Sequence, residues 1–283
     1  MNPGLALNWS AAATWSGGVA PIDDDDVITP EGTFQITDGL DQSAINLKSW
    51  RISNKAHIEI GSPASPLLIN VDGTANTGLV NRAASGNLYI SGTVPKSIHE
   101  SQVARTWHVG GAVALIIAAA PAGLVIVGAA ATLGDLYAPR GHIDVAAHAS
   151  DRIANAWIGD GKIITRRSIE QGYGAGRGML ELQKAATIAD GASTAKMRLL
   201  NPAFVMHVLC NAAITIDAID GFAGTFTPES SEGIITVSAL VETAALKFIE
   251  NYDAGKVVVT ARTTYGTPGS HALAGLGLTA EPV

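Results

Sequence analysis

Short apolar segments recur along most of the chain and are separated by turn-forming residues. From residue 34 onward, clusters such as Ile58–Ile60, Leu67–Val71, Leu88–Ile90 and Ile163–Ile164 alternate with stretches rich in Gly, Pro, Asn, Asp or Ser. Most cluster centres lie roughly 7–12 residues apart, which is the rhythm of short strands in a sandwich, a barrel or a solenoid. The pattern therefore predicts an all-β protein.

Two features of these segments favour the solenoid among the three. Many clusters are consecutively apolar rather than strictly alternating, as strands buried in a parallel stack tend to be. Few links carry the Asp-Gly signature of a tight hairpin, although Asp72-Gly73 and Asp160-Gly161 do. Three strands per coil at this spacing predict coils of roughly 20–30 residues.

Residues 8–36 have the composition expected of a cap on the first coil. Trp9 and Trp15 lie close together, and Gly17-Gly18 and Pro21 follow them. A solenoid end exposes its core unless bulky side chains cover it, and an indole buries a large area while keeping a polar N–H at the rim. The other interpretation is that both tryptophans are ordinary core residues of a β domain.

The segment 112–133 carries no charged residue and is long enough to be a membrane-spanning helix. Pro121 and Gly123 divide it, and each half is short and rich in Val and Ile. We therefore expect two buried strands with a turn at Ala120–Gly123 rather than a transmembrane helix. Such an apolar pair needs cover on both faces, which suggests a subunit interface.

Three further segments affect the domain boundaries. Residues Ile98–Trp107 could form one short helix that interrupts the stack. The region after Leu240 reads either as an amphipathic helix or, as we prefer, as strands at Leu246–Ile249 and Lys256–Thr260. The glycine-rich stretch from Thr263 suggests an extended arm that needs a partner to be ordered. We expect an arm and cap at 1–36, a β-helix body at 37–262 and a tail at 263–283, with no linker that forces a split into two domains.

The amino-acid composition limits the classes of function that this protein can have. Only 15% of residues are charged, 47% are hydrophobic and 5% are aromatic, so the apolar content consists of small and β-branched residues. The formal net charge of −7 argues against binding to nucleic-acid phosphates. The single cysteine, Cys210, excludes a disulfide within the chain and is expected to be a buried thiol. The N-terminus lacks the pattern of a secretory signal, so synthesis in the cytoplasm is expected.

Candidate metal and nucleotide sites each have a simpler structural interpretation. Asp23–Asp26 could bind calcium, but neighbouring carboxylates in an extended chain point in opposite directions, so we expect a solvated turn. His142, Asp144 and His148 would share one face of a strand, yet a metal needs a fuller set of ligands and supports. The glycines of Gly172–Gly178 lack the following helix of a dinucleotide site, so we expect a flexible loop. We predict no cofactor and no metal.

No constellation of catalytic residues stands out either. Solenoid enzymes that cleave acidic polysaccharides need clustered carboxylates, and here the acids are scattered singly: Asp144, Asp151, Asp160, Glu170, Glu181 and Asp190. Stacking of coils could bring some of them together, but no Ser–His–Asp pattern with a nucleophile elbow is present. The remaining histidines form no pattern with His142 and His148. We predict that the protein is not an enzyme.

The N-terminal residues resemble two known families. Trp9-Ser10, Thr14-Trp15, Gly17-Gly18, Pro21 and Asp26-Val27-Ile28 look like the opening of right-handed parallel β-helix proteins. One such family contains the extracellular G8-type modules, and the other contains virion proteins of tailed bacteriophages. The segment Gly39-Leu40-Asp41-Gln42-Ser43-Ala44 followed by Leu47 resembles the second family. The resemblance covers roughly residues 8–70, and the acidic run departs from the usual glycine-containing turn.

The resemblance implies a capsid decoration, or cement, protein that sits on a shell, commonly as a homotrimer. The expected partners are the major capsid protein and further copies of the chain, without nucleic acid or membrane, and the expected location is the capsid surface of the virion. The N-terminal arm 1–20, the apolar pair 113–127, the tail and the tip of the glycine-rich loop supply the contact candidates: Trp9, Trp15, Val113, Leu115, Ile117, Leu124, Ile126, Arg177, Leu273 and Leu276. A polysaccharide-binding or polysaccharide-degrading β-helix resembling a tailspike, and a shell-forming coat subunit, stay open as alternatives.

Overall fold

The computed structural model describes residues 1–72, 78–148, 150–192, 194–230, 233–250, 257–267 and 270–273. These residues form β-strands and turns, with one 3₁₀ turn, η1 (Ala12–Thr14), and no α-helix. The strands run parallel to their partners on successive coils, so the predicted all-β parallel solenoid is confirmed. The chain divides into two compact units, Met1–Gly134 with Gly141–Asp144, and Asp135–Arg140 with Val145–Val283.

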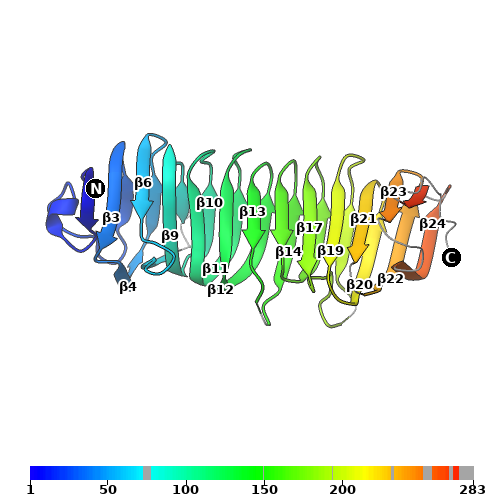
Figure 1. Cartoon of the computed structure of the whole chain (residues 1–283). Helices are drawn as coiled ribbons and strands as arrows, with labels where there is room; N and C mark the ends of the chain where they lie inside the picture. Colours follow the sequence, from blue (N-terminus) through cyan, green and yellow to red (C-terminus); the bar gives the residue numbers. More distant parts are fainter. Residues whose placement is uncertain are drawn as a thin grey trace. The chain divides into compact units, whose positions relative to one another are not determined.

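The first unit stacks its strands in columns (Figure 1). Strands β2, β5, β8 and β10 follow one another in one column, and β3, β6, β9 and β11 in a second. Strand β7 lies between β4 and β9 in a third. The bounds are β1 (Gly4–Asn8), β2 (Asp26–Thr29), β3 (Gly32–Asp38), β4 (Asp41–Leu47), β5 (Ser49–Ile52), β6 (Ala56–Ile60), β7 (Leu67–Val71), β8 (Leu79–Asn81), β9 (Ser85–Thr93), β10 (Lys96–His99), β11 (Arg105–Ala118) and β12 (Leu124–Ala138).

The second unit has two long columns. Strands β14, β16, β18, β20, β22 and β24 stack in one, and β15, β17, β19, β21, β23 and β25 in the other. The bounds are β14 (Ile153–Ile158), β15 (Lys162–Thr165), β16 (Ile169–Gly174), β17 (Met179–Lys184), β18 (Lys196–Leu199), β19 (Val205–Cys210), β20 (Ile214–Gly221), β21 (Gly224–Ser230), β22 (Ile235–Thr243), β23 (Leu246–Glu250), β24 (Val257–Tyr265) and β25 (Ser270–Leu273). Strand β13 (His142–Val145) belongs to the first unit except for its last residue.

Side chains that point inward stack on their counterparts in the next coil. In β6 every second residue is buried, and its inner residue Ile58 lies in register with Phe34 of the coil before. Ile60 continues the same pattern to Leu88 on β9, and all four side chains are almost fully buried. Each such apolar contact removes surface from water at about 25 cal/mol per Å², so the stack itself stabilises the fold.

Glycine is required at one sharp corner of the first unit. Gly86 has φ of 101° and lies in register with Ile58 of the neighbouring coil. A Cβ atom at this position would overlap the backbone carbonyl of Ile58. The backbone conformation and the close approach of the two coils therefore both exclude a side chain.

Several local predictions are confirmed and one is wrong. The turn at Ala120–Gly123 separates β11 from β12, and the strand pair expected after Leu246 is present as β23 and β24. Residues Ile98–Trp107 do not form a helix, because Ile98 and His99 end β10 and Arg105 already starts β11. Between them the Ser101 hydroxyl donates to the Ala83 carbonyl at 2.6 Å and accepts from Ala104 N–H at 2.8 Å, which fixes a turn.

The chain ends differ in how much of each is paired. The expected N-terminal arm contributes β1, which pairs with β3, and β3 continues past the expected boundary at residue 36. The expected tail begins inside β24, which pairs with β22, and includes β25. Leu276 lies outside the described residues, as does the side chain of Leu273.

Candidate functional site

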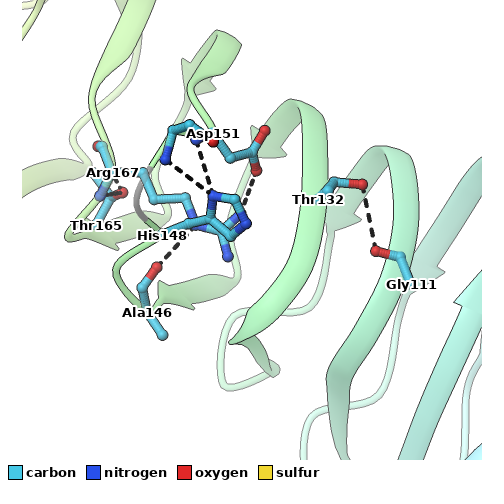
Figure 2. Close-up of polar contacts among 8 residues, drawn as sticks. Gly111, Thr132, Ala146, His148, Asp151, Thr165 and Arg167 are labelled. Carbon is cyan, nitrogen blue, oxygen red and sulfur yellow. Dashed lines mark hydrogen bonds and ion pairs between the residues drawn. The ribbon is translucent and has the colours of Figure 1, made fainter.

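The most unusual surface of the first unit is a charge-free band, defined here as residues 106–134. It comprises most of β11 and the first part of β12, and it contains no Asp, Glu, Lys or Arg. The Thr132 hydroxyl donates to the Gly111 carbonyl at 3.4 Å, so the two strands lie side by side here (Figure 2). Its exposed residues are mostly small: Gly111, Ala112, Ala114, Ala129 and Ala130.

Side chains along these strands alternate between inward and outward directions, so the contact residues predicted from the sequence fall into a buried and an outward-facing group. Val113 points into the core and is 2% exposed, so its side chain is not available to a partner. The predicted side chains that face outward are half-buried, because stacked neighbours cover their flanks: Leu115, Ile117, Leu124 and Ile126. The band thus presents apolar and small residues on its outer side.

The tryptophans form the predicted cap of the first unit. The Trp9 ring packs edge-on against Trp15 at 5.0 Å between centroids and against Trp50 of the next coil at 5.2 Å. The Trp15 indole N–H donates to the Trp9 carbonyl at 2.7 Å. Trp9 is fully buried and Trp15 nearly so. Both rings close the core of their own unit, so the side chain of Trp9 is not available to a partner, whereas contact by Trp15 stays a prediction.

The acidic run fastens the cap to the first coil. Asp23 accepts from Asn46 N–H at 2.8 Å, and Asp25 accepts from Ile22 N–H at 2.9 Å. Asp26 accepts from the Ser49 hydroxyl and pairs with Lys48, and these contacts hold the pKa of Asp26 below its usual range. The carboxylates are thus aimed at separate groups of the chain rather than at a common calcium ion.

Two buried imidazoles share one hydroxyl inside the first unit. The Ser97 Oγ atom lies 2.8 Å from His99 Nε2 and 3.1 Å from His108 Nε2. The rings of His99 and His108 meet edge to face at 5.9 Å, and all three residues are at most 3% exposed. A hydroxyl has one proton, so it donates to one Nε2 atom and accepts from the other.

The imidazoles are held in their neutral form. Burial lowers the pKa of His108 to about 4. Burial, together with the charge that His108 would carry, lowers the pKa of His99 well below its usual value. The sequence suggested no link between these histidines, because they meet only through the folding of β10 onto β11.

The histidines considered as metal ligands have other roles. His148 Nδ1 accepts from Ser150 N–H at 3.3 Å and from Asp151 N–H at 2.9 Å, which closes a tight turn in the second unit (Figure 2). His142 and Asp144 belong to the first unit. In the part of the chain that the structure describes, no group of three His, Cys, Asp or Glu residues could hold a metal ion.

A buried arginine organises the same turn. The Arg167 side chain is completely buried and pairs with Asp151, while its Nε donates to the Ala146 carbonyl at 2.9 Å (Figure 2). The Arg167 backbone N–H donates to the Thr165 hydroxyl at 2.9 Å. Burial lowers the pKa of Arg167, and the Asp151 charge opposes that effect. In the sequence, Arg166 and Arg167 form an adjacent basic pair, and nothing in it shows that Arg167 rather than Arg166 is the buried residue.

The glycine-rich segment 172–178 is not the flexible loop that the sequence suggested. Gly172 and Gly174 belong to β16. Gly176 and Gly178 lie so close to the backbone of Gly159 and Gly161 that no side chain would fit. Arg177 is exposed, and its N–H donates to Asp160 at 2.9 Å. The glycines therefore permit two coils to pack closely, and Arg177 stays a contact prediction.

Aromatic rings and charged groups line one column of the second unit. Tyr137 stacks on Trp157 at 4.2 Å, and Trp157 lies in register with Tyr173. The Arg198 guanidinium lies 5.1 Å above the Tyr173 ring, and its Nε lies 3.7 Å from Asp220. The rings cover one another's faces, as in a stack that stabilises neighbouring coils.

The other carboxylates of the second unit have separate local partners. Glu181 pairs with Lys162 at 3.0 Å and accepts from Gln183; burial raises its pKa, but these contacts outweigh that effect and the pKa is lowered. Asp190 accepts from Thr194 and from Ala192 N–H, which lowers its pKa to about 2. These two acids thus stabilise their own surroundings and do not converge on one cleft.

Two remaining predictions can be placed only in part. Cys210 ends β19, and its side chain lies outside what the structure describes. The segment 112–133 forms strands, and the described residues include no helix that is long and apolar enough to cross a membrane.

Comparison with known proteins gives no relative. No family model, no curated protein and no solved structure matches the chain.

Proposed function

We propose that this chain is a structural virion protein that decorates a capsid shell and stabilises it as an oligomer. The observation that supports the proposal is the charge-free band. Interface cores are depleted of charged residues, and small side chains allow a second surface to approach closely. A stable interface buries about 800 Å² on each partner, and a surface held by parallel strands needs little rearrangement to bind.

A rigid solenoid suits this role mechanically. Each coil is hydrogen-bonded to the next along parallel strands, so the band keeps its shape when a partner binds. The buried His99 and His108 and the buried ion pair of Arg167 with Asp151 serve the fold of the chain itself. The proposed partners are the major capsid protein and further copies of this chain, most simply as a homotrimer on the virion surface.

The direct test is binding to shells assembled from the proposed partner, a major capsid protein. Ala112→Glu and Ala130→Glu place a charge on exposed positions of the band, and Ala203→Glu does so at an exposed alanine of the second unit. We expect co-sedimentation of the wild type and of Ala203→Glu with shells, and at least about tenfold weaker binding of the two band variants, because burying an unpaired charge is costly. Absence of wild-type binding would overturn the proposal.

A second candidate is polysaccharide binding, which the column of Tyr137, Trp157, Tyr173 and Arg198 favours. Rings and charged groups in a line could meet a sugar chain that runs across the coils. Decoration is preferred, because stacked rings present their edges rather than their faces. Retention on immobilised host polysaccharide that is lost in Trp157→Ala would reverse this preference.

A further inference from the structure

Three large apolar side chains are exposed in the N-terminal cap, where polar side chains are expected. A terminal cap keeps a solenoid soluble by turning polar groups outward. Here Leu5, Val19 and Ile22 are 71%, 69% and 64% exposed. They lie outside the tryptophans that already close the core, so they add nothing to that closure. Large apolar side chains at this position indicate a surface that another chain covers.

A groove of about 390 Å³ lies beside this apolar surface. Val19 and Pro21 line it from one segment of the cap, Trp15 contributes to its wall, and Val27 and Ile28 line it from β2. Its polar lining residues are Ser16, Asp25 and Asp26. Strand β2 pairs with β5 and with no other strand among the described residues. The Ile28 carbonyl accepts from the Met1 ammonium group at 3.3 Å. A strand edge that pairs with no described strand, beside a groove that contains apolar side chains, is suited to an added strand.

A second groove of about 590 Å³ borders the same strand. Ile28 lines both grooves, and the second also contains Arg51, Arg82 and Glu100. Arg82 pairs with Glu100 at 2.6 Å, and Arg51 is exposed. A segment that follows β2 from the first groove into the second therefore meets apolar side chains first and arginine afterwards.

These features define the chemistry of the occupant. It must be extended, with apolar side chains at every second position and a carboxylate a few residues further on. The chain contains such a segment at residues 276–281, Leu-Gly-Leu-Thr-Ala-Glu, which lies outside the described residues. Leu276 and Leu278 would point to one side of an extended backbone. Glu281 would follow Leu278 by about 10 Å, at roughly 3.3 Å per residue.

We propose that residues 276–281 of a second copy add as a strand to β2, with the leucines against Val19 and Ile28 and Glu281 beside Arg51. This contact joins the tail of one copy to the cap of the next. Such a head-to-tail interface generates a closed ring if the rotation between copies closes, and an open filament if it does not. The inference concerns contacts between copies and does not depend on shell binding.

The test uses the full chain, a variant that ends at Leu273, and a synthetic peptide of residues 272–283. We expect the full chain to be oligomeric by analytical ultracentrifugation and the shortened variant to be monomeric. The peptide should bind the shortened variant, and Val19→Asp or Ile28→Asp in that variant should weaken binding at least about tenfold. Leu200→Asp, at an exposed leucine of the second unit, is the matched control and should bind as the parent does.

Two further measurements separate the parts of the proposal. A peptide with Leu276→Asp and Leu278→Asp should not bind, and a Glu281→Gln peptide should bind several-fold more weakly, with less dependence on salt. An oligomer that persists in the shortened variant would overturn the inference, as would a peptide that binds Val19→Asp and the parent equally. Shell binding by a shortened, monomeric variant would leave the proposed decoration function standing on its own.

Discussion

The side chains with the strongest constraints in this protein are those whose partners are brought close by the winding of the chain. Ser97 joins His99 and His108, Arg167 reaches back to Asp151, and Gly86 must leave room for the Ile58 carbonyl. None of these contacts follows from residue type, because the partner depends on how many residues each coil contains. Coil length differs along the chain, for example 16 residues between Ile153 and Ile169 and 29 between Trp50 and Leu79. The sequence therefore predicted burial at these places better than it predicted contacts.

The buried imidazoles predict acid sensitivity. The folded-state pKa of His108, about 4, lies below its unfolded value of 6.5, so the unfolded chain binds more protons between these two pH values. The contribution of the buried neutral imidazoles to stability is fully present above about pH 6.5 and is lost as the pH falls towards 4. The loss from His108 alone is roughly 3 kcal/mol.

Urea unfolding at pH 7, 5.5 and 4 measures this dependence. His108→Gln should make the curve of unfolding free energy against pH shallower in that window, whatever its stability at pH 7. His57→Gln, at an exposed histidine, should leave the slope unchanged. Equal slopes for His108→Gln and the wild type would contradict the assignment.

The Arg167–Asp151 pair predicts a large effect from a single carboxylate. Asp151→Ala leaves the Arg167 guanidinium buried without its charge partner, and we expect a loss of about 3–5 kcal/mol in unfolding free energy. Asp160→Ala removes an exposed carboxylate that accepts one backbone N–H, and about 1 kcal/mol is expected. Thermal and urea unfolding of both variants check the difference. Similar losses of unfolding free energy would show that the buried ion pair stabilises the fold no more than the exposed carboxylate does.

At the scale of elements, strands with a regular apolar pattern were predictable and corners were not. The cap, the turn at Ala120–Gly123 and the strands after Leu246 follow from local composition. Residues 98–107 suggested a helix, because their polar and apolar residues fit a helical turn as well as they fit two strand ends. The glycines at 176 and 178 suggested mobility, whereas they mark the close packing of neighbouring coils.

The cap tryptophan predicts unfolding that starts at one end. Trp9→Ala removes the ring that joins Trp15 to Trp50, and we expect a loss of about 3–5 kcal/mol in stability. Because each coil contacts only its neighbours, amide exchange should accelerate most in β2 and β3. Trp157→Ala, a half-buried ring of the second unit, should leave exchange in these strands unchanged. Uniform acceleration along the chain would contradict an end-localised effect.

At the scale of the whole molecule, the sequence established the class and the structure supplied the surfaces. Composition, charge and strand rhythm predicted a β-solenoid without a recognisable reaction centre. They could not show which apolar residues stay exposed, because exposure is decided by the register between coils. The exposed apolar side chains of Val19 and Ile22 in the cap are an example, since the sequence presented these residues only as neighbours of a turn.

If a partner binds through the charge-free band, as we propose, the band also affects how fast the two surfaces meet. The band itself contributes no ionised group that would attract a charged partner. Association through the band should then proceed near 10⁵–10⁶ M⁻¹s⁻¹ and change little with added salt. The lifetime of the complex, rather than the speed of encounter, would set its occupancy.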